Sequence, residues 1–259
     1  MAAVVQAIDP GASASELVAS KWIQEADAIL VCAGAGKSLL LLLMCWPHPT
    51  SPPHVSSGMS IHEEGGFHGN VYVDPAHFAE HYPGLPPLGY NTAYESMGLG
   101  RDTRVPNEVR KGYLIQHMNN MAFVIPPTPG HAELLELCKQ KGEENYFVWT
   151  SNVDNCFERS GFHADRIYTP QGRFSFMQCL QPGCRAVWDT KPVIDEVLPT
   201  VDPATSRIMD PSKIPTCPKC GSVNTMGNVR GGSWFVHDHY QVLPTAPSSP
   251  NYSVATLFP

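Results

Sequence analysis

The stretch from Tyr146 to Gly172 reads YFVWTSNVDNCFERSGFHADRIYTPQG, and it decides the fold. Its first five residues form an apolar run rich in β-formers, which predicts a buried strand. A polar turn follows, and then a short helix with Phe157 on its buried side and Gly161 as a left-handed cap at its end. Residues 166–168 form a second strand. This order of elements predicts one βαβ unit.

Polar residues follow each of these two strands. Asn152 and Asp154 come directly after the first strand, and Gln171 comes after the second. Ligands bind at the carboxyl ends of the strands in such units, so these three residues are the candidate site. An Asn-x-Asp tripeptide after a strand is also a common helix cap, and that alternative stays open for the tripeptide alone.

A second strand-and-turn pattern lies upstream. Residues 28–32 read AILVC, which predicts a strand buried on both faces. The turn Gly34-Ala35-Gly36 follows, where small residues let the backbone approach a pyrophosphate closely. Close packing of a strand on a helix explains such a turn about as often.

Four cysteines downstream have the spacing of a metal site. They are Cys179-x₄-Cys184 and Cys217-x₂-Cys220. Thiolates on two tight turns hold structural zinc in a tetrahedron with no open position. The segment between the two pairs, residues 189–214, is rich in proline, and we expect it to be irregular.

The ordered set of these motifs resembles the sirtuin (Sir2) family, from about residue 28 to about residue 236. Most sirtuins have a histidine where this chain has Gln171, and the glutamine resembles the macrodomain-linked class M sirtuins. The resemblance implies an α/β fold, with a Rossmann-like parallel sheet and a small zinc-binding domain. It also implies two ligands, NAD and zinc. The Asp-Phe-Arg motif of most sirtuins is absent near residue 67.

The resemblance assigns roles residue by residue. It implies that Asn152 and Gln171 are catalytic. It implies that cofactor contacts come from Gly34, Ala35, Gly36, Ser60, Asn152 and Asp154. It implies that the zinc ligands are Cys179, Cys184, Cys217 and Cys220.

Residues 37–57 interrupt this pattern with a leucine run and then four prolines in seven residues. Without them the turn continues into Met59-Ser60, as in a sirtuin. Codons for Gly36-Lys37-Ser38 can contain a splice donor, so we hypothesise an unspliced intron that forms no part of the sheet. A genuine insertion is the alternative.

The domain organisation follows from these motifs. We expect an NAD-binding domain over 1–172, a zinc domain over 173–229 and a return to the large domain over 230–241. Residues 242–259 have no helix or strand pattern, and the last strands of a sirtuin sheet have no equivalent there, which suggests truncation.

Composition narrows the choice of partners. A net charge of −7 argues against electrostatic binding to nucleic acid or to a membrane surface. Residues 1–19 lack Arg and Lys, unlike a secretory signal, and eight cysteines favour a reducing, intracellular compartment.

The function expected from the resemblance is NAD-dependent ADP-ribosylation of a protein. By family analogy the acceptor is a lipoyl-carrier protein. Deacylation of protein lysines and a catalytically inactive binding module are the alternatives.

Overall fold

The computed structural model describes residues 21–33, 39–44, 71–169 and 171–227. Its elements, in chain order, are β1 (Ala28–Ala33), β2 (Leu39–Met44), α3 (Pro75–His81), η1 (Pro86–Leu88), η2 (Glu95–Arg101), α4 (Asn107–Asn119), the π-helical turn η3 (Asn120–Val124), α5 (Pro129–Lys139), β3 (Tyr146–Thr150), α6 (Cys156–Arg159), η4 (Ala164–Arg166), β4 (Ile167–Tyr168), β5 (Phe176–Cys179), β6 (Val187–Asp189), α7 (Thr190–Val197), η5 (Leu198–Thr200), β7 (Val201–Asp202), β8 (Arg207–Ile208), η6 (Pro211–Lys213) and β9 (Thr225–Gly227).

The large sheet has the strand order β2-β1-β3-β4. Strands β1, β3 and β4 are parallel, with Val31 opposite Val148 and Trp149 opposite Tyr168. This confirms the predicted α/β class and the βαβ unit around residues 146–172. Helices α5 and α6 pack beside the sheet, and the predicted left-handed cap is present, because Gly161 has a φ of 97° after α6.

The core of the large domain lies between the sheet and these helices. It includes Ile29, Val31, Leu134, Leu135, Cys138, Tyr146, Val148, Phe157, Phe162 and Ile167. Along β1 only alternate residues are buried, so the expectation that this strand is buried on both faces is wrong. Residues 21–25 are helical, and Trp22 and Ile23 pack against the same core.

One prediction about residues 37–57 is also wrong. Leu39–Met44 forms strand β2, which pairs antiparallel with β1 from Ala28↔Met44 to Ala33↔Leu39. A run of leucines can satisfy the unpaired backbone groups of a neighbouring strand edge, whatever its origin. Strand β2 is at the edge of the sheet, not at its centre. Residues 45–57 lie outside the described part, and the intron hypothesis stays a prediction.

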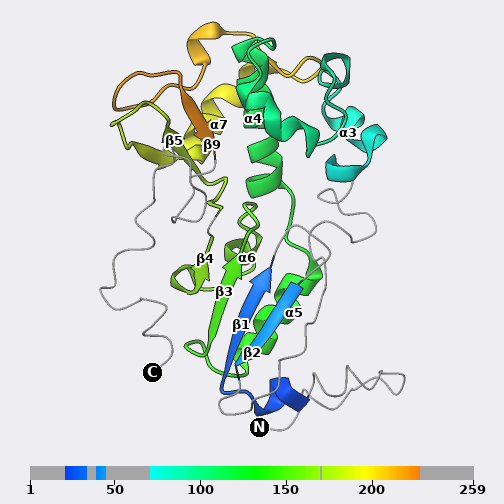
Figure 1. Ribbon diagram of the computed structural model, residues 1–259, viewed down its shortest axis with the longest axis vertical. Coiled ribbons are helices and arrows are strands. Elements are labelled where there is room, and N and C mark those ends of the chain that lie inside the picture. Colours follow the sequence, from blue (N-terminus) through cyan, green and yellow to red (C-terminus); the bar gives the residue numbers. More distant parts are fainter. Residues whose placement is uncertain (1–20, 34–38, 45–70, 170, 228–259) are drawn as a thin grey trace.

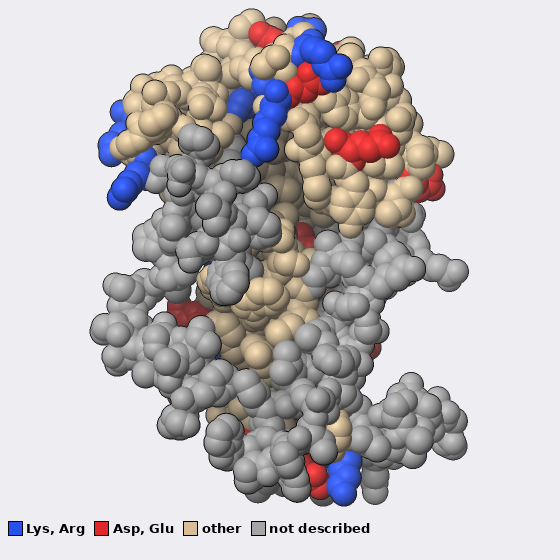
Figure 2. All heavy atoms as spheres, viewed as in Figure 1, with Lys and Arg blue, Asp and Glu red and all other residues tan. Residues whose placement is uncertain are grey.

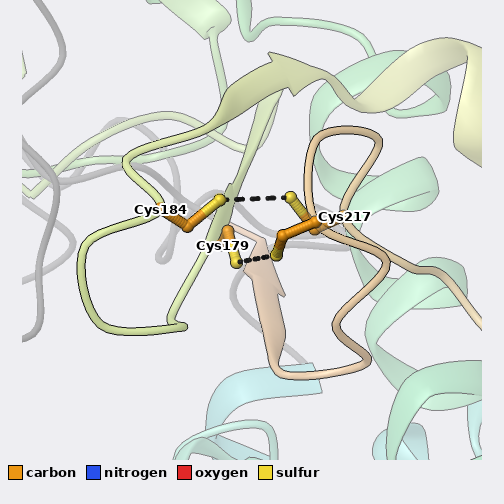
Figure 3. Close-up of side chains that lie close together, drawn as sticks. Cys179, Cys184 and Cys217 are labelled. Carbon is orange, nitrogen blue, oxygen red and sulfur yellow. Dashed lines mark hydrogen bonds between the residues drawn. The ribbon is translucent and has the colours of Figure 1, made fainter.

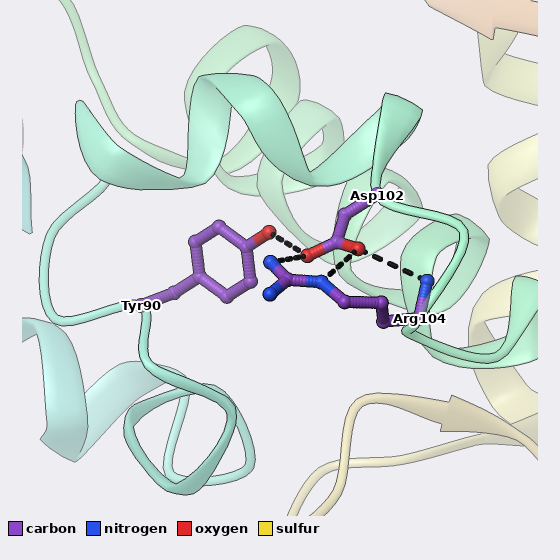
Figure 4. A network of polar contacts seen from close by, with 3 residues as sticks. All are labelled: Tyr90, Asp102 and Arg104. Carbon is purple, nitrogen blue, oxygen red and sulfur yellow. Dashed lines mark hydrogen bonds and ion pairs between the residues drawn. The ribbon is translucent and has the colours of Figure 1, made fainter.

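A second module lies above the large sheet in Figure 1. Its helical part runs from α3 to η3, and an aromatic cluster that includes Phe78, Tyr82 and Tyr113 forms its core. A polar contact closes one of its loops: Tyr90 donates to Asp102 at 2.8 Å, and Arg104 donates to the same carboxylate through Nε and Nη2 (Figure 4). None of the described helices is long and apolar enough to cross a bilayer.

The part of this module that contains the four cysteines has a small sheet of order β6-β5-β9 and the helix α7. The expectation of an irregular segment over 189–214 is wrong, because α7 and the β7-β8 hairpin lie within it. Ile194 and Val197 are about one helical turn apart and are both buried, and this spacing was a helical signal that the prolines obscured. The hairpin packs on α4, where Gly112 leaves room for the Ser206 carbonyl.

The outer surface of this module carries charges of both signs. In the view of Figure 2 these charged side chains gather over the upper part of the molecule. The described surface along the middle of this face is mostly uncharged. The charged surface and the uncharged band therefore lie on different parts of this face.

Candidate functional site

The loop after β3 contains two of the predicted site residues. Ser151 continues the parallel pairing, because its N–H donates to the Ala33 carbonyl at 2.8 Å. The Asn152 N–H donates to Thr150 Oγ1 at 3.0 Å. The Asn152 side-chain oxygen is buried and has no hydrogen-bond partner among the described residues. A buried amide oxygen without a partner is costly, so it is suited to a ligand that donates to it.

Asp154 is a buried carboxylate, with 5% of its surface exposed. Its Oδ1 accepts the N–H of Cys156, the first residue of α6, at 2.9 Å. The N-cap position itself is Asn155, whose side chain makes no capping hydrogen bond, so Asp154 closes a turn just before the helix. Asn155 between them has a φ of 59°, a left-handed conformation that Asn tolerates better than most residues. The turn uses only one of the two carboxylate oxygens of Asp154.

The loop after β4 lies against the loop after β3. The N–H of Phe174 donates to the Val153 carbonyl at 2.8 Å, and Gly172 closes a turn on Thr169 with a φ of 84°. Gln171 therefore lies in a turn. Just after that turn, Phe174 is hydrogen-bonded to Val153, the residue between Asn152 and Asp154. That Gln171 and Asn152 share one cleft stays a prediction.

A pocket of about 310 Å³ opens beside these loops. It is lined by the end of η3, by α6 and by Arg173 and Ser175. Arg173 pairs with Glu158 at 3.1 Å, and each of these two side chains is 21% exposed. Burial raises the pKa of Glu158, and the positive charge of Arg173 opposes that rise. Sequence reasoning did not find this pocket, because its walls come from three separate segments.

Four of the predicted cofactor contacts, Gly34, Ala35, Gly36 and Ser60, lie outside the described residues. Tyr72 is affected electrostatically by Asp154, which the sequence did not reveal. Burial raises the pKa of Tyr72 strongly, and the negative charge of Asp154 adds to the rise. Tyr72 lies far along the chain from every predicted polar residue after β3, so no local pattern could have linked them.

The four predicted metal ligands converge on one point. Their Sγ atoms all lie within 4.8 Å of one another, and the pairs Cys179–Cys220 and Cys184–Cys217 are both 3.6 Å apart (Figure 3). A tetrahedron with Zn–S bonds of about 2.3 Å has edges of about 3.8 Å, so the cluster fits one zinc ion. This confirms the convergence that the spacing predicts.

The backbone around Cys217 favours a thiolate. The Gly221 N–H donates to the Cys217 carbonyl at 2.8 Å, which closes the tight turn between the second pair. Burial tends to raise the pKa of Cys217, but hydrogen bonds from the N–H groups of Cys220 and Lys219 outweigh it and bring the pKa to about 7. Burial raises the pKa of Cys179 and Cys184, so Cys217 is the thiol among these three that most readily forms a thiolate.

Comparison with known proteins gives one curated relative. No protein-family model matches the chain. A "Probable bifunctional ADP-ribose hydrolase/ADP-ribosyltransferase" of Fusarium oxysporum f. sp. cubense is 33% identical over 226 residues, which cover 86% of this chain and 32% of that protein. The chain therefore spans about a third of the length of that relative.

Solved structures with a similar arrangement include Sir2 proteins. One, from a study of the mechanism and regulation of Sir2 enzymes, has a TM-score of 0.42 and 19% identity, covering 84% of this chain and 64% of that one. Another is a complex of a mutant Sir2 homologue with ADP-ribose, with a TM-score of 0.42, 19% identity and coverage of 85% and 66%.

Proposed function

We propose that this chain is the NAD-consuming part of a sirtuin-type protein ADP-ribosyltransferase. The observation that carries the proposal is the loop at the carboxyl end of β3, which contains the buried Asp154 and the buried side-chain oxygen of Asn152. Val153, between them, accepts a hydrogen bond from Phe174 in the segment that follows Gln171. The likeness to a fungal protein named as a hydrolase and transferase of ADP-ribose supports the same substrate class.

Each polar residue has a role in this proposal. The unsatisfied amide oxygen of Asn152 accepts a hydrogen bond from a hydroxyl of the nicotinamide ribose. Asp154 holds the neighbouring part of the nucleotide with its second oxygen. Gly34, Ala35, Gly36 and Ser60 contact the phosphates and their surroundings. Gln171 orients the ribose by hydrogen bonds.

The glutamine determines which reaction we prefer. A sirtuin that deacylates lysine uses a histidine to remove a proton from a ribose hydroxyl. A primary amide does not titrate near neutral pH, so Gln171 cannot act as that base. Cleavage of the nicotinamide bond and transfer of ADP-ribose to a protein do not need it. ADP-ribosyl transfer is therefore the first choice, and deacylation is the second.

Zinc has a structural role in the proposal. Cys179, Cys184, Cys217 and Cys220 supply four thiolates, which fill the tetrahedron and leave no position for a reacting group. A zinc ion held by these four cysteines would join β5 to the turn before β9, and it would thereby fix the small sheet that follows the Gln171 turn.

Nicotinamide release is the decisive measurement. The chain is mixed with NAD, and binding is followed by calorimetry while free nicotinamide is quantified. We expect binding with release, and a loss of release in Asn152→Ala. The matched control is Asn91→Ala, at an exposed asparagine of the other module. Absence of NAD binding leaves only the inactive-module alternative.

A second assay separates the two reactions. The chain is incubated with NAD and either an acyl-lysine peptide or a lipoyl-carrier protein, the acceptor class that the family resemblance suggests. Labelling of the carrier by ADP-ribose supports transfer. Loss of the acyl group from the peptide at a comparable rate contradicts the argument from Gln171.

A further inference from the structure

Two segments of the described chain pass between the large domain and the module above it. The first leads from Met121, in the aromatic core of the helical module, to α5 in the core of the large domain. The second leads from Ile167, in the core of the large domain, to Met177 on β5. We call residues 120–128 the first crossing and residues 171–175 the second crossing. In Figure 1, helix α6 lies at the level where the chain passes from the sheet to the upper module.

The first crossing begins with the π-helical turn η3, which ends before two prolines. Ile125 is extended, with φ −69° and ψ 124°, as expected for a residue that precedes proline. Pro126 and Pro127 have no N–H, so the carbonyl groups at this end lack the donors that a longer helix would supply. Arg159 on α6 binds two of these carbonyl groups. Its Nη1 donates to the Ile125 carbonyl at 2.5 Å, and its Nη2 donates to the Phe123 carbonyl at 3.4 Å.

The residue before Arg159 binds the second crossing. Glu158 pairs with Arg173, with 3.1 Å between Oε1 and Nη1. Each of these side chains is only 21% exposed, so the loss of one partner leaves a mostly buried charge without its counter-ion. In the loop just before α6, the Val153 carbonyl accepts the N–H of Phe174 at 2.8 Å. One short helix and the loop before it therefore contact both crossings.

Open space separates part of the two crossings. The pocket of about 310 Å³ has Phe123 of the first crossing, Ser175 of the second and several residues of α6 in its wall. A close-packed interior would resist any shift of one crossing against the other, but a space of this size does not. At this place the side chains of Glu158 and Arg159, and not close packing, limit such a shift.

We propose that Glu158 and Arg159 form a clamp, which holds both crossings on α6 and so fixes the angle between the large domain and the upper module. The proposal rests on the proposed function, because Asn152 lies in the loop before α6 and Gln171 lies in the second crossing. The clamp sets where these two side chains stand relative to one ribose. Glu158 and Arg159 are positioning residues that act through Asn152 and Gln171.

Hydrogen exchange of the zinc-loaded chain measures the clamp without reference to activity. Two backbone N–H groups report on it: that of Ile125, which donates to the Asn120 carbonyl at 2.9 Å, and that of Phe174 in the second crossing. We expect Glu158→Gln to raise exchange at Phe174 about ten-fold or more. Arg159→Gln should raise exchange at Ile125 by less, because its side chain is exposed. Because α6 holds both crossings, each variant should also raise exchange at the other crossing.

Glu136→Gln is the matched control for these variants. Glu136 pairs with Lys139 at 3.2 Å, nearly the same distance, but both side chains are exposed and belong to one helix. Exchange at both reporting N–H groups should therefore equal that of the wild type. If each clamp variant changes exchange only in its own crossing, or in neither, the clamp is overturned.

Nicotinamide release measures the positioning role. Arg173→Met removes the charge opposite Glu158 and keeps an apolar stem, whereas Arg173→Lys keeps the charge. We expect kcat/KM for NAD to fall about ten-fold or more in Arg173→Met, because a misplacement of about 1 Å in a reacting site can cost about a hundred-fold. Arg173→Lys should retain more activity at matched thermal stability.

The two arginine variants also show how the proposal fails. Wild-type activity in Arg173→Met, or an equal loss in both variants, overturns the positioning role. If the wild type releases no nicotinamide, the proposed function fails, and hydrogen exchange alone then decides whether the clamp is correct.

Discussion

Gly112 in α4 is the position where one methyl group should disturb the module most directly. A Cβ placed there lies 2.0 Å from the Ser206 carbonyl oxygen and 3.0 Å from its carbon. Ser206 is fully buried and has a φ of 55° at the turn of the β7-β8 hairpin. Both neighbours are backbone atoms, so no side chain can rotate away, and the hairpin itself must move.

The expected change in the free energy of unfolding has two opposing parts. Alanine gains about 1 kcal/mol over glycine in a helix interior. Forcing extra volume into a packed core costs about 1–3 kcal/mol, and a contact as short as 2.0 Å belongs at the upper end of that range. Gly112→Ala should therefore destabilise the protein by about 2 kcal/mol.

Urea unfolding of the zinc-loaded chain measures this difference. Gly98→Ala is the matched control, because a Cβ at Gly98 meets nothing within 4 Å. We expect Gly98→Ala to be neutral or slightly stabilising. If Gly112→Ala unfolds at the same urea concentration as the wild type, the packing of the hairpin on α4 is not as described.

Three further predictions concern zinc, pH and the glutamine. Elemental analysis should find one zinc per chain, and Cys217→Ser should lose most of it and lower the melting temperature of the small module. Burial lowers the pKa of Lys111, which donates to Thr225, to about 8 from 10.5. Between these pH values the unfolded chain binds more protons, so stability should rise by up to about 1.4 kcal/mol per pH unit, and Lys111→Met should lose that slope in urea titrations. Gln171→His should gain measurable deacylation of an acyl-lysine peptide; no gain would argue against deacylation by the wild type as well.

Short stretches of the sequence were enough to predict several of the secondary-structure elements. The apolar run at 146–150 and the cap at Gly161 were both predictable, because each depends on residues within a few positions. The cysteine set was predictable for a related reason, since spacing within each pair is fixed by a tight turn. Helix α7 and strand β2 were not predicted, because prolines hid one and a non-periodic leucine run hid the other.

The sequence by itself determined the βαβ unit, the Asn-x-Asp loop at its carboxyl edge and the four thiol ligands. The βαβ unit and its loop follow from short-range hydrogen bonding and from the pattern of apolar residues. The thiol ligands follow from the short spacing within each cysteine pair. Only the tertiary structure decided which distant groups come together: the Tyr72 hydroxyl meets the His117 ring, and Arg173 pairs with Glu158. Such contacts depend on how the helical module packs onto the sheet, and burial and charge at that contact have no signature in any single stretch of the chain.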